Sequence, residues 1–363
     1  MARRLEADRI LFGASVVLVL IGALMVFSAS AVMAQVKFQS SYYFLVRQLI
    51  WAALGLAVMV VAMNLDYHQL RRPQVVFPLL GLQFVLLVAV LFTGGGHHTH
   101  RWLRLGLANF QPAELSKIVL IVFLAYFLDQ RREGIHDWQH TFLPIGLVVG
   151  TSLALVVKQL DFGTSLAIAL VVAVMLFVAG LRLRYFAAMI LTALPLLYLL
   201  VFRVRYRYDR LLAFWDPYAD PLGKGFQVIQ SLIAVGTGGI TGVGLMESKQ
   251  KLFYLPEPQT DFIFAVICEE LGFIGAGVVL ALFGVILWRG LRAALNCENE
   301  FGRLLAVGIT FMVVGQALVN ISVVLGLLPT KGIPLPLVSY GGSSLLMTLL
   351  ALGILLNISQ HAN

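Results

Sequence analysis

The run ILFGASVVLVLIGALMVFSASAVM, residues 10–33, decides the fold class of this chain. It carries no charged residue, and as a helix it is long enough to cross the roughly 30 Å of hydrocarbon in a bilayer. Similar runs recur along the sequence, so that 60% of the residues are hydrophobic, 12% are charged and the mean hydropathy is +0.91. This composition excludes a soluble domain and indicates a polytopic membrane protein.

Ten apolar stretches, most of them about 20 residues long, predict ten transmembrane helices. Strands of a membrane β-barrel would instead be short and would alternate in polarity. We therefore expect an all-α fold with one membrane domain over residues 1–363 and a large outer loop at about 203–261. The predicted spans are 10–33, 44–63, 75–93, 112–128, 142–158, 164–180, 185–202, 262–288, 304–325 and 343–359.

The placement of Lys and Arg sets the orientation, because short cytoplasmic loops retain positive charge. Pairs such as Arg71 with Arg72 and Arg131 with Arg132 fall on the side of the N-terminus. Both termini are therefore expected in the cytoplasm, and the loop 203–261 outside. The net charge of +8 then reflects topology and does not indicate nucleic-acid binding. A cleaved signal peptide is the alternative for the first span, but its apolar run exceeds the usual length of about 7 to 15 residues.

The stretch YLPEPQTDFIFA, residues 254–265, places Asp261 between a proline-stiffened loop and the outer mouth of the eighth span. An ionisable side chain at the edge of hydrocarbon costs roughly 2.5 kcal/mol or more, so it usually marks a site. Glu269 and Glu270 lie about two turns further along the same span. A functional contact and a structural partner are both open for these two glutamates.

A second outer cluster, RWLRLGLANFQPAELSK at residues 101–117, leads into the fourth span. Glu114 and Lys117 are spaced i, i+3 on one helix face and can neutralise each other. They form either a structural ion pair or a unit in which Lys117 also reaches Asp261 and holds it ionised. Arg101 and Trp102 either anchor the interface or bind a phosphate and an acyl or ring surface. The preceding His97, His98 and His100 give only a weak metal signal.

Three further segments place polar groups and glycines on the outer side. The run 203–210 alternates Arg and Tyr and suits anionic headgroups or a lipid-linked phosphate. The glycines of residues 236–244 are not a nucleotide loop and favour tight turns and close backbone approach beside a helix end. Residues 327–344 combine three prolines with two consecutive glycines and predict a rigid re-entrant turn. Gln316 and Asn320 add polarity within the ninth span, where hydrogen bonds between helices are the simpler interpretation.

Several of these motifs, in order along essentially the whole chain, resemble the SEDS family of shape, elongation, division and sporulation proteins. The resemblance rests on QPAELSK at 111–117, LDFGTS at 160–165, the segment 230–244, TDFIFA at 260–265 and PLPLVSYGGSS at 334–344. The motif LPTKG at 328–332 resembles the division branch more closely than the rod-elongation branch. Gln259, however, stands where many relatives have His.

The resemblance implies a ten-helix peptidoglycan glycosyltransferase in the bacterial cytoplasmic membrane. Such an enzyme polymerises lipid II at the outer face, next to a class B penicillin-binding protein and other divisome or elongasome membrane proteins. Asp261 is expected to be the general base, with Lys117 and Glu114 as catalytic partners. Mg²⁺ or Mn²⁺ could share the neutralisation of the pyrophosphate, but no dedicated metal cage is visible. Substrate contacts are expected at Arg101, Trp102, Arg210, Gln230, Ser231, Glu257, Ser339 and Ser343.

Two other classes of function remain open from the sequence. A flippase for lipid-linked precursors would use intramembrane polar residues along a translocation path. The polar residues here gather at one face, whereas transporters often place them at the midplane of paired repeats. A scaffold without catalysis would only activate a penicillin-binding protein, and Asp261 would then need a structural explanation.

Overall fold

In a computed structural model of the chain, which describes residues 7–92, 101–105, 108–131 and 137–361, helices account for nearly all regular structure. Each predicted span corresponds to a helix whose ends lie within a few residues of the expected ones, apart from α10, which continues further. These helices are α1 (Arg9–Phe38), α2 (Tyr43–Asn64), α3 (Pro73–Phe92), α4 (Pro112–Gln130), α5 (Leu143–Lys158), α6 (Phe162–Val178), α7 (Leu183–Phe202), α10 (Ile263–Leu295), α11 (Glu300–Val324) and α12 (Gly342–Ser359).

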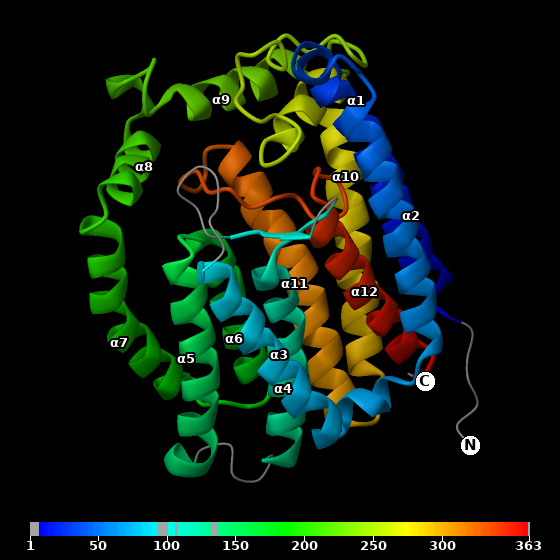
Figure 1. Ribbon diagram of the computed structural model, residues 1–363, viewed down its shortest axis with the longest axis vertical. Coiled ribbons are helices and arrows are strands. Elements are labelled where there is room, and N and C mark those ends of the chain that lie inside the picture. Colours follow the sequence, from blue (N-terminus) through cyan, green and yellow to red (C-terminus); the bar gives the residue numbers. More distant parts are fainter. Residues whose placement is uncertain (1–6, 93–100, 106–107, 132–136, 362–363) are drawn as a thin grey trace.

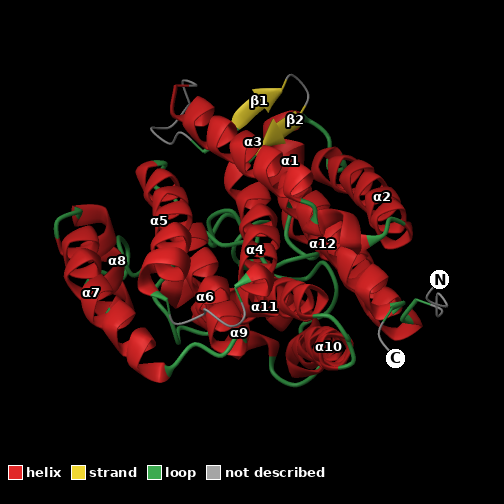
Figure 2. Cartoon of the chain, turned by 90° about the horizontal axis from the view of Figure 1, so that it is seen from below, coloured by secondary structure: helices red, strands yellow, loops and turns green. Residues whose placement is uncertain are grey.

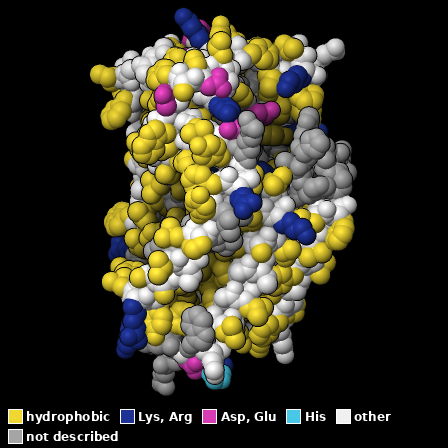
Figure 3. Space-filling view, turned by 90° about the vertical axis from the view of Figure 1, so that its left-hand side faces the viewer, with side chains coloured by type: hydrophobic (Ala, Val, Ile, Leu, Met, Phe, Trp, Pro, Cys, Tyr) yellow, Lys and Arg dark blue, Asp and Glu magenta, His cyan; other side chains and the backbone are white. Residues whose placement is uncertain are grey.

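Seven of the described helices are long and apolar enough to cross a membrane, namely α1, α2, α3, α10, α11, α12 and the segment Gln139–Lys158 that includes α5. The helix α6 is apolar but shorter. Apolar side chains cover much of the face seen in Figure 3, and acidic side chains on that face lie near its two ends. Lys and Arg side chains also lie at mid-height on that face, so it is the large apolar share of the surface that is typical of a protein surrounded by lipid.

Helix α11 is the centre of the bundle. It packs against α10, α6, α4 and α12, and most of its length is buried. Around this core α12 packs on α2, and α1 packs on α10 and α2. Helix α7 packs mainly on α8 (Arg205–Trp215) and lies at the periphery in both ribbon views (Figures 1 and 2). The start of α1 and the end of α12 lie at one end of the bundle, opposite α9 (Phe226–Gly238) (Figure 1).

Two parts of the sequence prediction need correction. The fold is not purely helical, because β1 (Leu103–Leu105) and β2 (Ala108–Phe110) pair antiparallel, with Leu103 opposite Phe110. Such a hairpin satisfies backbone groups locally in a segment too short and polar for another span. The predicted loop 203–261 contains α8, the short helix η4 (Pro217–Ala219) and α9. Two short helices, η1 (Tyr67–Arg71) and the π-helical η3 (Trp138–Phe142), lie in other connections.

Helix α10 is broken at Gly272, which has φ 64° and ψ −162°. The loop after α9 pairs with this break: the amides of Val243 and Gly244 donate to the carbonyls of Glu269 and Glu270, and Phe273 donates to Gly239. A side chain at Gly242 would collide with the Glu270 carbonyl at 2.1 Å. The expectation that these glycines allow close backbone approach beside a helix is confirmed. The N-terminal part of α10 is thereby tied to the segment that leads to Asp261.

Candidate active site

The backbone around Asp261 is fixed by three consecutive hydrogen bonds from other elements. Asp261 precedes α10 by two residues. The Tyr340 amide donates to the Gln259 carbonyl at 2.9 Å, the Ser339 hydroxyl to the Thr260 carbonyl at 2.6 Å, and the Asn320 side-chain amide to the Asp261 carbonyl at 2.7 Å. Helix α11 and the segment that follows it therefore hold this turn in place.

The two buried glutamates of α10 hold the loop that precedes Asp261. Glu270 pairs with Lys251 at 2.8 Å and accepts the Ser28 hydroxyl of α1 at 2.7 Å. The Glu269 carboxylate accepts the Lys249 amide at 3.0 Å and the Ser248 hydroxyl. The question left open by the sequence is thus answered in favour of structural partners. Removing one partner would leave a buried charge uncompensated, which is costly. These carboxylates therefore hold the loop in place.

The Asp261 carboxylate itself is partly buried and accepts no hydrogen bond from any side chain in the described ranges. Its wall on one side is Gly332: a methyl group added there would lie 2.9 Å from Asp261 Oδ2. Burial raises the pKa of Asp261 from 3.8 to about 6, while Arg210 and Arg101 oppose that rise and Glu257 and Asp161 add to it. The group is therefore mostly ionised at neutral pH yet basic enough to accept a proton.

Two predicted cationic residues act electrostatically on this carboxylate. The Arg210 guanidinium donates to the Thr330 carbonyl at 3.1 Å, and Arg101 donates to the carbonyls of Gln159 and Leu160. Arg210, Lys224 and Thr330 also line a cavity of about 340 Å³ together with Asp209, Gly223, Phe226, Gln227 and Pro256. Arg210 both lines this cavity and acts electrostatically on Asp261, and such a combination of cations and a base suits a substrate that carries both a hydroxyl and a phosphate.

Lys117 does not reach Asp261, so the sharper of the two hypotheses for it is wrong. Its ammonium group lies 2.9 Å from the Glu114 carboxylate and donates to Gln316 Oε1 at 2.7 Å. Gln316 in turn donates to the Pro334 carbonyl at 2.9 Å. Glu114 and Lys117 are 2% and 5% exposed, so the pair neutralises itself in the interior and braces the re-entrant segment.

The other predicted substrate contacts divide into engaged and accessible side chains. The Ser231 hydroxyl donates to the Val324 carbonyl at 2.8 Å, and Ser339 both donates to Thr260 and accepts the Leu335 amide. Ser343 is buried at 1% exposure. Ser231 and Ser339 are therefore engaged with backbone groups, whereas the buried Ser343 hydroxyl has no hydrogen-bond partner among the described residues. Trp102 and Glu257 are exposed, and Gln230 is half-buried. The Glu257 carboxylate accepts a hydrogen bond from the Gln259 side-chain amide at 3.0 Å.

Sequence reasoning missed two residues of this site. Asp161 caps α6 through the Thr164 amide, accepts the Gln111 side chain at 2.7 Å, and acts electrostatically on Asp261. Its signal was an aspartate three residues before a threonine at a helix start. Asn320 was interpreted as a contact between helices, but it bonds to the turn of Asp261.

A metal cage is not formed by the residues that the structure describes, since no three His, Cys, Asp or Glu side chains converge there. Asp161 and Glu257 are already engaged by Thr164 and Gln259. His97, His98 and His100 lie outside the described residues. The acids near Asp261 therefore do not fit a dedicated cation site, and no chemical step is assigned to one.

Comparison with known proteins gives a consistent result. The FTSW_RODA_SPOVE family model, described as "Cell cycle protein", matches residues 8–363. A "Probable peptidoglycan glycosyltransferase FtsW" of Geobacter sulfurreducens is 49% identical over 356 residues, covering 98% of this chain and 95% of the relative. The "Stage V sporulation protein E" of Bacillus subtilis is 44% identical over 363 residues, covering 99% of each.

Solved structures share the fold over nearly the whole chain. A chain from a study of how a peptidoglycan synthase complex coordinates polymerization and crosslinking superposes with a TM-score of 0.80 at 33% identity, covering 97% of each chain. The crystal structure of the rod shape determining protein RodA of Thermus thermophilus gives a TM-score of 0.71 at 30% identity, covering 97% of this chain and 96% of that one.

Proposed function

Because the chain belongs to the FtsW, RodA and SpoVE family of cell cycle proteins, we propose that it is a peptidoglycan glycosyltransferase of septal cell-wall synthesis. It polymerises lipid II into β-1,4-linked glycan at the outer face of the cytoplasmic membrane. Ten spans with both termini in the cytoplasm would place Asp261 at that face. The start of α1 and the end of α12 lie at the end of the bundle opposite α9, which supports this topology (Figure 1).

One observation carries the proposed mechanism: the Asp261 carboxylate, which has a raised pKa and accepts no hydrogen bond from described side chains, feels the charge of Arg210, and Arg210 also lines a cavity together with Lys224. In the proposed reaction the acceptor 4-hydroxyl attacks the anomeric carbon of the donor. The bond between that carbon and the pyrophosphate oxygen breaks, and the hydroxyl proton passes to Asp261. General base catalysis of this kind contributes about 10²- to 10⁴-fold in rate.

The leaving pyrophosphate carries the electron pair and needs positive charge nearby. Arg210 and Lys224 line the cavity of about 340 Å³, and the charges of Arg210 and Arg101 act on the Asp261 carboxylate. Fixed cations stabilise a charge that develops during the reaction without reorganising. Lys224 already pairs with Asp209 at 2.8 Å, so its net contribution is smaller than that of the arginines.

The polyprenyl chain of the substrate needs an apolar path beside the site. An almost wholly apolar cavity of about 220 Å³ lies between α6 and α11, lined in part by Leu170, Gly315 and Ile333. Ile333 directly follows Gly332, which packs on the Asp261 carboxylate. We propose that a part of the tail of the lipid-linked substrate occupies this cavity. The likeness to a chain of a peptidoglycan synthase complex supports a class B penicillin-binding protein as the partner.

The test is glycan polymerisation from purified lipid II by the reconstituted protein with its partner. Asp261→Asn and Asp261→Ala should lose polymer at equal folding. Asp216→Asn is the matched control, because Asp216 is an exposed helix cap on the same outer face and Asn caps equally well. Undiminished polymer in both Asp261 variants would refute the general base. Lipid II translocation without polymerisation by the wild type would instead favour a flippase, and neither activity would favour a scaffold.

A further inference from the structure

The side chain of Asn320 connects the two backbone segments that shape the surroundings of Asp261. Its Nδ2 group donates to the Asp261 carbonyl at 2.7 Å and to the Ile333 carbonyl at 2.7 Å. We infer that Asn320 is a positioning residue that fixes the Asp261 carboxylate against Gly332. This inference rests on the proposed function of Asp261 as general base.

Both hydrogens of one amide group are used, and each acceptor matters for the carboxylate. One belongs to Asp261 itself, and the other belongs to Ile333, whose neighbour Gly332 presses on Asp261 Oδ2. Asn320 is only 1% exposed, so water cannot easily replace its donors. Loss of the amide would leave two backbone carbonyls without their donor and would release the two segments from each other.

The neighbouring contacts show why this residue differs from the others. Ser339 and Tyr340 hold the carbonyls of Thr260 and Gln259, which fixes the path of the loop but not Asp261 itself. Gln316 lies one helical turn before Asn320 on α11. It donates to the Pro334 carbonyl and accepts a hydrogen bond from Lys117. In the described part of the chain, Asn320 is the side chain that bonds both to Asp261 and to the segment carrying Gly332.

A carboxylate released from Gly332 would gain water. Four charged groups act on it from different elements: Arg210 of α8, Arg101 before β1, Glu257 of the preceding loop and Asp161 at the start of α6. Because burial is the largest cause of its raised pKa, added hydration should lower that pKa from about 6 toward 3.8. Loss of Asn320 should therefore change the pH dependence as well as the rate.

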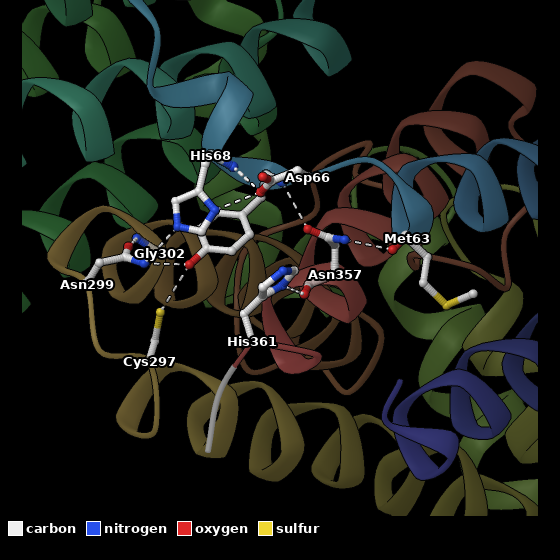
Figure 4. A network of polar contacts seen from close by, with 9 residues as sticks. Met63, Asp66, His68, Cys297, Asn299, Gly302, Asn357 and His361 are labelled. Carbon is white, nitrogen blue, oxygen red and sulfur yellow. Dashed lines mark hydrogen bonds and ion pairs between the residues drawn. The ribbon is translucent and has the colours of Figure 1, made fainter. Parts of the chain in front are cut away.

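The experiment measures lipid II polymerisation against pH for the full chain with its partner. Asn320→Leu removes both donors at similar volume. Asn320→Ser keeps one donor, and it provides the test if Asn320→Leu fails to fold. The control is Asn357→Leu at the opposite end of the bundle. Asn357 is also buried, donates to Met63 at 2.7 Å and accepts the Tyr67 amide at 2.9 Å (Figure 4).

We expect Asn320→Leu to lower kcat on the order of 10²-fold with little change in KM, as for a misplacement near 1 Å. Its acid midpoint should move to lower pH, with Asn320→Ser in between, whereas Asn357→Leu should keep the wild-type midpoint. A wild-type midpoint and kcat in both Asn320 variants would overturn the inference.

An infrared titration of the Asp261 carboxyl band, identified by its absence in Asp261→Asn, gives the midpoint without catalysis. A shifted band in Asn320→Leu supports the positioning role even if Asp261→Asn remains active, in which case only the general-base proposal fails. An unshifted band in a folded variant with wild-type kcat refutes the positioning role while leaving the proposed function intact.

Discussion

The raised pKa of Asp261 predicts that this residue destabilises the protein at neutral pH. A rise from 3.8 to about 6 means that folding favours the protonated acid, so the ionised form opposes folding by about 3 kcal/mol above pH 6. Asp261→Asn resembles the protonated acid at every pH. The variant should therefore be more stable than the wild type at pH 7 by up to about 3 kcal/mol while losing polymerisation.

The direction of the pKa shift of Asp261 decides how the stability of the protein changes with pH. Between pH 3.8 and 6 the folded state binds the proton more tightly, so wild-type stability falls as the pH rises through this window. The advantage of Asp261→Asn should be complete above pH 6 and should vanish below pH 3.8. Thermal unfolding of the detergent-solubilised protein at pH 7.5 and about pH 4 measures it.

The control is again Asp216→Asn, an exposed cap that should change stability by less than about 0.5 kcal/mol at either pH. An Asp261→Asn variant that is no more stable than the wild type at pH 7.5 would refute the burial argument. So would a stabilisation that does not depend on pH, because it would have to arise from something other than the charge.

Four further changes test the remaining parts of the site. Polymerisation by the wild type should fall about tenfold between pH 7 and pH 5, because fewer Asp261 carboxylates are ionised below about pH 6; an unchanged rate would contradict the assigned base. Gly332→Ala places a methyl group 2.9 Å from Asp261 Oδ2 and should lower kcat on the order of tenfold, whereas Gly284→Ala, which meets no atom within 4 Å, should not. Gly315→Phe should fill the apolar cavity and raise KM for lipid II, while Gly315→Ala meets Leu170 only at 3.6 Å and should behave as the wild type; equal kinetics of the two would argue against a tail site. Glu114→Gln leaves the buried Lys117 charge without its partner and should cost about 3 to 5 kcal/mol in unfolding measurements, with the double change Glu114→Leu and Lys117→Met costing less than the single one.

The sequence by itself determined the helical class of the fold and predicted the place of the site. Apolar runs such as residues 10–33 predict helices directly, because each must satisfy its backbone within the bilayer. The ionisable Asp261 at the mouth of α10 indicated the site, since a carboxylate there is costly without a role. The glycines of residues 236–244 also revealed close backbone approach, because they are needed only where side chains do not fit.

Tertiary structure alone decided which side chains meet around Asp261. The spacing of Glu114 and Lys117 predicted their pairing, but only the packing of α4 against α11 shows that Lys117 turns to Gln316 and not to Asp261. Asn320 and Asp261 are 59 residues apart in the sequence, and Gly332 and Asp261 are still further apart. The local sequence does not predict these long-range contacts, because they follow from how the helices pack and where the chain re-enters the bundle.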